Sequence, residues 1–408
     1  MTLQKTIRAR VISPIFQFLK DSRAVGIVLI VCTVISLIIA NSPWQQQYIS
    51  FFTTLFDPAG GHHYEYRGLH LPNSLLLWIN DGFMALFFFL VGMEIKRELT
   101  VGELASIRKA MLPALAAVGG MVAPALIYVI FNHNTEYHHG WGIPMATDIA
   151  FSLGIISLLG KRVPLSLKVF LTALAIIDDL GAILTIALFY TDELHTVYLY
   201  AGAGIFALLL ILNFLKVRRL IFYFIPGLVL WYCVFNSGIH ATIAGVLLAF
   251  TIPLDKIHHL EDNLHDPVNF LIMPVFALAN TAIPFPADLL NAFSHAVSFG
   301  IMSGLILGKP LGIFTFCYLA VKLKLASLPS QTNWKQLWGV GMIAGIGFTM
   351  SIFIATLAFD DAEIQVVSIM SVIAASVIAA TGGFIFLKTL TGEPKTKQPK
   401  PAQNKIPE

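Results

Sequence analysis

Two adjacent aspartates lie in the middle of a long apolar run, and this feature constrains the chain more than any other. Residues 169–191 form a stretch of 23 residues whose only charges are Asp178 and Asp179. About 20 apolar residues suffice for a helix to cross a bilayer, which places both carboxylates near the midplane. Because an ionised side chain there costs roughly 2.5–3.5 kcal/mol, the pair predicts a site for a cation, for protons or for both.

The composition is that of a membrane protein. Of the 408 residues, 57% are hydrophobic and 12% are charged, whereas soluble domains carry about 25% charged residues. The three cysteines, Cys32, Cys233 and Cys317, are too scattered for a disulfide framework or a zinc site. The net charge of +3 gives no indication of nucleic-acid binding.

Hydropathy predicts an all-α polytopic membrane protein with about 12 transmembrane helices. We expect an N-terminal segment at residues 1–22, a transmembrane domain at 23–388 and a disordered tail at 389–408. The expected spans are 23–41, 75–95, 111–132, 141–159, 166–190, 197–215, 220–235, 238–254, 267–283, 297–320, 337–358 and 365–388.

The lysines and arginines alternate between successive loops without a break. Of the 26 basic residues, 24 fall on one side of the predicted topology; Arg67 falls on the other side, and Lys309 falls inside a span. The positive-inside rule then predicts that both termini are cytoplasmic. The alternation also supports an even number of spans, because one missed helix would invert every later loop.

The longest segment on the opposite side, residues 41–74, contains a candidate hairpin. Residues 64–71 alternate between apolar and polar side chains and include Gly68, as in two short paired strands. A plain surface loop and a contact for a homodimer are both open interpretations of this segment.

Three further features predict broken helices at the midplane. Lys309 is the only charge between residues 299 and 321, and Pro144 precedes Asp148 in the fourth span. The eleventh span carries Gly345 and Gly347 two residues apart, which weakens a helix. Because a helix break must line a cavity in a membrane, we expect Asp148 at a positive half-helix end and Lys309 at a negative one. Close helix packing is the alternative explanation for the glycines.

Five motifs together resemble the bacterial NhaA-type Na⁺/H⁺ antiporter family. The resemblance covers nearly all of the chain from the first span to about residue 388. The motifs are FLVGMEIKREL at 89–99, ATDIAF at 146–151, IIDDLG at 176–181, GKPLG at 308–312 and GIGFTMS at 345–351. It implies inverted repeats and two broken helices, spans 4 and 11, which cross near Thr147 and at Gly345 and Gly347.

The resemblance also implies roles for individual residues. Na⁺ would bind at Asp179, with Asp178 beside it, and Lys309 would pair with Asp178 when no ion is bound. Neighbouring helix positions are about 100° apart, so the two aspartates need not face the same way. Thr147 would add an oxygen ligand, and Asp148 would balance charge.

The family also places pH sensing in residues away from the midplane. These candidates are Glu94, Arg97, Glu98, Glu261 and His265 at the cytoplasmic mouth and His240 near the outer side. Without the resemblance, the mouth residues would be ordinary solvated side chains.

The expected function is an electrogenic, pH-regulated antiporter of the inner membrane, not an enzyme. The transported ions would be Na⁺ or Li⁺ and H⁺, with no cofactor and no nucleic-acid partner, and a homodimer is possible. A sodium-coupled symporter or a cation channel is the main alternative. An intramembrane aspartyl protease is disfavoured, because its two acids stand on separate helices, usually with a Gly-x-Gly-Asp signature.

Overall fold

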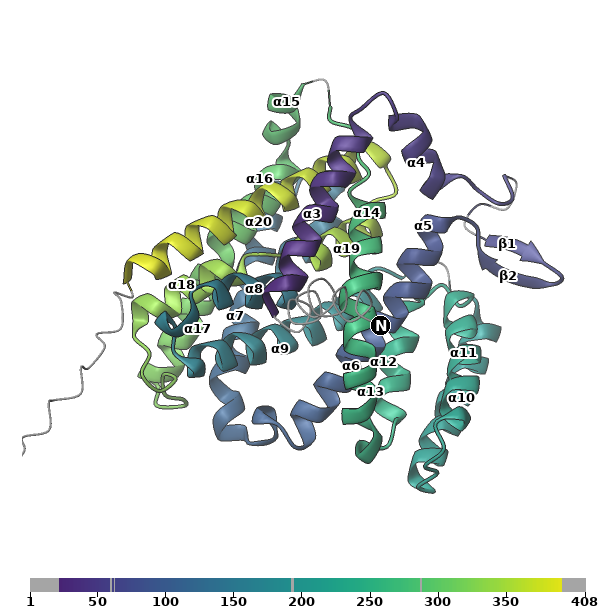
Figure 1. Ribbon diagram of the computed structural model, residues 1–408, viewed down its shortest axis with the longest axis horizontal. Helices are drawn as coiled ribbons and strands as arrows, with labels where there is room; N and C mark the ends of the chain where they lie inside the picture. The colour runs from purple at the N-terminus through teal and green to yellow at the C-terminus, as the bar shows by residue number, and fades with distance from the viewer. Residues whose placement is uncertain (1–21, 59–60, 62, 192–193, 287, 391–408) are drawn as a thin grey trace, which may run out of the picture.

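The chain is an assembly of apolar helices with one small hairpin (Figure 1). A computed structural model describes residues 22–390 except 59–60, 62, 192–193 and 287. All but the first two residues of the predicted tail, and all but the last residue of the predicted N-terminal segment, therefore lie outside the described residues.

Six helical segments of the described chain are long and apolar enough to cross a membrane, as a polytopic membrane protein requires. Four of them are the uninterrupted helices α7, α9, α10 and α20, and the other two contain a π-helical turn. Their bounds are α5–η2–α6 (Leu75–Leu77, Trp78–Phe83, Met84–Thr100), α7 (Ile107–Asn132), α9 (Leu165–Phe189), α10 (Thr196–Phe214), α16–η7–α17 (Ala296–Ser303, Gly304–Gly308, Lys309–Lys322) and α20 (Ala362–Leu390).

Three further helix pairs are apolar but bent. The bend is 116° between α3 (Ser22–Ala40) and α4 (Gln45–Thr53), 44° between η4 (Glu136–Met145) and α8 (Ile149–Leu158), and 46° between α18 (Trp334–Ala344) and α19 (Phe348–Ala358). The fourth and eleventh predicted spans are thus broken, as expected.

The remaining helices are η3 (Glu103–Ala105), η5 (Gly160–Arg162), α11 (Ile221–Phe235), α12 (Thr242–Thr251), α13 (Leu254–Pro267), η6 (Val268–Ile272), α14 (Met273–Asn280) and α15 (Leu289–Ser294). The count of 12 spans and the inverted repeats stay predictions.

The predicted hairpin is confirmed. Strands β1 (His63–Tyr66) and β2 (Leu69–Pro72) are antiparallel. The two turn residues, Arg67 and Gly68, have φ values of 53° and 81°. Positive φ at both positions is typical of a type I′ turn, whose twist matches that of the strands.

Side-chain hydrogen bonds bring several of the basic helix ends together. The Lys96 ammonium at the end of α6 donates to the carbonyls of Phe250 (2.8 Å) and Ile252 (2.5 Å) at the end of α12. The Asn213 amide near the end of α10 donates to Thr251 (2.5 Å). We call this side, with the adjacent start of α7, the basic end of the molecule.

Other contacts join loops that carry no lysine or arginine, among them the one at the opposite end of α10. The Tyr190 hydroxyl after α9 donates to the carbonyl of His139 in η4 (2.7 Å). The His195 amide before α10 donates to the carbonyl of Ser237 after α11 (3.0 Å). The alternation of basic and non-basic loops in the sequence therefore corresponds to two separate ends of this helical assembly.

Hydropathy gave no sign of the π-helical turns η2, η6 and η7. In η7 the Lys309 amide donates to the carbonyl of Gly304, five residues back. Pro310 has no amide proton, so the regular bond back to Ile306 is missing at this point. π-Helical turns occur often at functional sites, and this one leads directly into the buried lysine.

Candidate functional site

The two broken helices cross where each loses its helical hydrogen bonds. The Asp148 amide, in the gap between η4 and α8, donates to the carbonyl of Ile346, in the gap between α18 and α19 (2.7 Å). The Ser152 hydroxyl donates to the carbonyl of Ile343 across the same crossing (3.2 Å). A backbone amide freed by one break is thus bonded to a carbonyl freed by the other. Such pairing is needed inside a membrane, because lipid offers no hydrogen-bond partners to backbone groups.

Close backbone contact explains one of the two glycines at the crossing. A Cβ atom added to Gly345 would lie 2.4 Å from the carbonyl oxygen of Leu305 in η7. At Gly347 it would lie 2.1 Å from the Ser351 hydroxyl oxygen, which is a side-chain atom of the same half-helix. Ile346, which accepts the bond from the other break, lies between these two glycines, and close packing applies there as well.

Asp148 joins the starts of α8 and α19, the second halves of the two broken helices. One of its carboxylate oxygens accepts a hydrogen bond from the Phe151 amide at the start of α8 (2.9 Å). The other accepts from the Thr349 amide at the start of α19 (3.2 Å) and from the Thr349 hydroxyl. This is the expected placement of an acid at a positive helix end, here shared by two helices.

Lys309 pairs with Asp178 and also contacts Thr147. Its ammonium donates to an Asp178 carboxylate oxygen and to the Thr147 hydroxyl oxygen (2.7 Å). All three residues are fully buried. That Lys309 offsets a negative half-helix end stays a prediction: the Thr147 hydroxyl, which the ammonium contacts, lies 2.8 Å from the Ala344 carbonyl at the end of α18. The same hydroxyl lies 2.7 Å from Asp178, so its one proton serves one of these two acceptors.

Asp179 has a different environment from its neighbour. It is 1% exposed, and its Oδ1 atom has no hydrogen-bond partner among the described residues. It lines a cavity of about 220 Å³ together with Asp148, Thr172 and Thr349. The two adjacent carboxylates therefore diverge, one toward the lysine and one toward the cavity.

The same cavity extends to the proposed pH-sensing residues at the basic end. Glu94, Arg97, Glu98 and His265 line it. The Arg97 guanidinium lies 3.1 Å from a Glu261 carboxylate oxygen and 3.3 Å from one of Glu98. Glu261 lies in α13, outside the predicted spans. Its burial raises the pKa of its carboxyl above the ordinary value, and the nearby Arg97 charge offsets part of that rise.

His240 is separate from this group. It lines a second cavity, of about 530 Å³, at the opposite end of the molecule, together with Asn80, Asp81, Tyr190 and Thr356. The sequence-based grouping into an inner and an outer set of candidates agrees with this arrangement.

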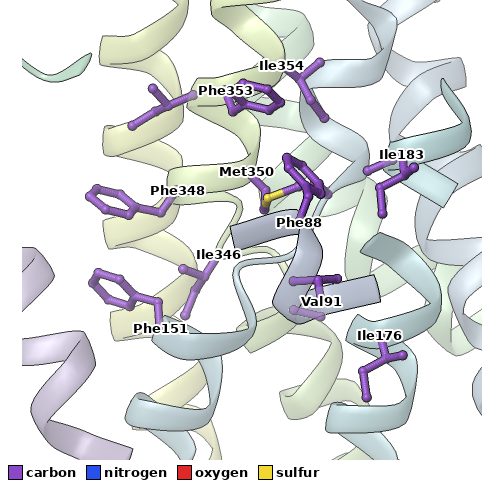
Figure 2. Close-up of a cluster of buried hydrophobic side chains, with 14 of the residues drawn as sticks. Phe88, Val91, Phe151, Ile176, Ile183, Ile346, Phe348, Met350, Phe353 and Ile354 are labelled. Atoms are coloured by element: carbon purple, nitrogen blue, oxygen red, sulfur yellow. The ribbon is translucent and has the colours of Figure 1, made fainter. Parts of the chain in front are cut away.

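A layer of buried apolar side chains, among them Phe88, Ile183 and Phe353, is part of the cluster drawn in Figure 2. Along α19, Met350 lines the first cavity and Thr356 the second, with Phe353 between them in sequence. Phe88 of α6 meets Phe353 with ring centroids 5.5 Å apart, and Ile183 of α9 occupies the corresponding level on its helix. Along α19 these side chains therefore separate the cavity that reaches the basic end from the cavity at the other end.

Sequence reasoning missed Thr349 and the apolar layer. Thr349 lies inside the GIGFTMS motif, so a hydroxyl directly after a helix break was a readable signal. Phe88 and Phe353 resemble the many other phenylalanines of the spans, so no sequence signal distinguished them. Among the described residues, no three His, Cys, Asp or Glu side chains are grouped to hold a metal ion, so hydroxyl, carbonyl and water oxygens would have to complete a cation site at Asp179.

Comparisons with known proteins identify what the chain is similar to. A family model described as Na⁺/H⁺ antiporter 1 matches residues 16–387. The chain is 52% identical over 379 residues to Na(+)/H(+) antiporter NhaA 2 of Flavobacterium johnsoniae, a match covering 91% of each protein. It is 48% identical to the Na(+)/H(+) antiporter NhaA of Cytophaga hutchinsonii (93% of this chain, 96% of the relative) and 49% identical to that of Yersinia enterocolitica (91% and 96%).

Proposed function

This chain belongs to the Na⁺/H⁺ antiporter 1 family, the NhaA antiporters, and from that premise we propose that it exchanges Na⁺ or Li⁺ for H⁺ electrogenically at Asp179. The family makes it a transporter of Na⁺ and H⁺ and a multi-pass membrane protein. The site, the coupling to membrane potential and the pH regulation are the proposal.

One observation carries the proposal: Asp179, whose Oδ1 has no hydrogen-bond partner among the described residues, lines a cavity that reaches the basic end. Asp178, next to it, is held by Lys309 and Thr147. Desolvated carboxylates must be neutralised by a bound cation or a proton. A cation at Asp179 and protons on the same carboxylates therefore exclude one another, which is the requirement for exchange.

Lys309 gives the exchange its charge balance. When no cation is bound, its ammonium neutralises Asp178. A cation that draws Asp178 toward Asp179 would compete with Lys309 for the same carboxylate, and Thr147 and Asp148 would supply further oxygen and negative charge. If two protons return for each Na⁺ exported, one net charge moves inward per cycle. A potential of 100 mV then contributes about 2.3 kcal/mol to Na⁺ export.

The basic end faces the cytoplasm in this proposal, because lysine and arginine mark cytoplasmic loops. The structure is then open to the inside, and the layer of Phe88, Ile183 and Phe353 must part for Na⁺ to leave through the outer cavity. Both termini would be cytoplasmic in the bacterial inner membrane. The mouth cluster around Arg97 and Glu261 would set the pH dependence, since it lines the entrance and contains titrating carboxylates.

The test is reconstitution in liposomes with simultaneous recording of internal pH and membrane potential. A Na⁺ gradient should drive proton movement and generate a potential in the wild type, and Asp179→Asn should abolish both. Asp288→Asn is the matched control, because Asp288 caps the exposed helix α15 and asparagine caps equally well. Proton movement that persists in Asp179→Asn would refute the assignment of the site.

A symporter or channel would give a different record. Na⁺ flux that depends on a solute, or that flows without proton movement, would overturn exchange and support that alternative.

A further inference from the structure

A third cavity, partly polar, lies at the basic end, away from the ion site. It measures about 700 Å³ and is enclosed by the starts of α7 and α9 and by residues 327–331 between α17 and α18. The Ser166 hydroxyl of α9 donates to the carbonyl of Ser330 (2.5 Å) and fastens that segment to the helix. Its volume falls within the roughly 300–1,000 Å³ of ordinary ligand sites.

The polar part of this cavity is positively charged. Arg108 and Lys109, in the first turn of α7, both line it. Neither α7 nor α9 has an acidic residue in its first turn, so nothing there offsets the positive helix starts. The single acid of the lining, Glu103, is 3.2 Å from the Lys109 ammonium. A ligand that fits these charges is an anion.

Another part of the cavity wall is apolar and continues onto the exposed surface of α9. Leu165 and Val169 of α9 line the cavity and are 76% and 41% exposed. Leu112 and Phe170 form its buried floor. A soluble anion gains nothing from such a wall, whereas a lipid places its phosphate on the cations and its acyl chain along the apolar side chains.

We propose that this cavity binds an anionic phospholipid of the cytoplasmic leaflet, with its phosphate at Arg108 and Lys109 and an acyl chain along Leu165 and Val169. The leaflet follows from the orientation proposed above, while the chemistry of the site does not depend on ion transport. The bound lipid contacts α9, which carries both midplane aspartates, and the segment leading into α18, which forms the helix crossing.

The experiment is native mass spectrometry of the full-length protein titrated with phosphatidylglycerol in detergent. Each lysine or arginine near an anionic membrane surface contributes roughly fivefold in affinity, so Arg108→Gln/Lys109→Gln should weaken binding about 30-fold. The control Lys256→Gln/Lys388→Gln removes two basic residues elsewhere at the basic end and should bind like the wild type. Glu103→Gln removes the competing acid and should strengthen binding.

Two further ligands test whether the site is specific for an anionic lipid. Phosphatidylcholine and inorganic phosphate should each bind far more weakly than phosphatidylglycerol. Equal loss in the two double variants would mean unspecific attraction and refute the site, and inorganic phosphate matching phosphatidylglycerol would refute a lipid. If Arg108→Gln/Lys109→Gln proves unstable on size exclusion, unchanged or weaker binding in Glu103→Gln would overturn the proposal by itself.

Discussion

Lys309→Met tests the buried ion pair most directly. The substitution keeps an apolar stem of similar length but leaves the fully buried Asp178 carboxylate without its cation. Breaking a buried pair by removing one partner costs about 3–5 kcal/mol. Asp178→Asn should cost a similar amount, because it leaves the Lys309 ammonium buried and unpaired.

The double variant separates pairing from packing. Asp178→Asn/Lys309→Met contains neither charge, and the Thr147 hydroxyl remains in place for the new amide. Two independent effects would sum to about 6–10 kcal/mol, whereas removing both charges together should cost no more than about 3 kcal/mol. The expected coupling energy is therefore at least about 3 kcal/mol.

The assay is a titration of folded protein with sodium dodecyl sulfate in mild detergent, followed by tryptophan fluorescence. Lys322→Met is the matched control, because Lys322 lies exposed at the other end of the same helix α17, and it should change stability by no more than about 0.5 kcal/mol. If the effects of the two site substitutions add to within about 0.5 kcal/mol, the two charges do not stabilise each other and the reasoning fails.

Three further predictions use the same unfolding measurement. Gly345→Ala should destabilise by about 1–3 kcal/mol, because its Cβ would lie 2.4 Å from a backbone oxygen; Gly204→Ala, with nothing within 4 Å, should be neutral or slightly stabilising, and equal effects would contradict the packing argument. Thr349→Val should cost about 1.5–3 kcal/mol, because a buried carboxylate loses a hydroxyl donor. A loss of stability below about 0.5 kcal/mol, the usual size for a neutral substitution, would count against that bond. Burial raises the pKa of Glu261, so the folded protein keeps this proton longer than the unfolded chain, and its contribution to stability falls as pH rises from the ordinary value of 4.5 through the raised pKa. Arg97→Gln removes the charge that lowers this pKa, so the decline should extend to higher pH; an unchanged pH profile would show that the ion pair has no such effect.

Local patterns in the sequence were enough to predict most of the helices. The apolar runs and the alternation of basic loops depend only on what a bilayer accepts, and the helices begin and end close to the expected limits. Pro144, Gly345 and Gly347 predicted the two breaks, because proline and glycine act on the backbone of their own helix.

The partner of Lys309 was a different kind of problem. Three acids, Asp148, Asp178 and Asp179, were predicted at a depth comparable to that of Lys309. Only the family resemblance selected Asp178 as its partner. In the structure the selection follows from the crossing of the broken helices, which brings Thr147 beside both residues. Sequence distance carries no information about such a contact, since Thr147 and Lys309 are 162 positions apart.

The sequence alone therefore specified a membrane-spanning helical chain with acids, a lysine and two helix breaks near the midplane. Only the folded arrangement showed that Asp178 faces the lysine while Asp179 lines a cavity, that Thr349 binds Asp148, and that Phe88 packs against Phe353. The physical reason is that hydrophobicity and helix breaking act within one segment, whereas the direction a buried side chain faces depends on which other helices pack around it.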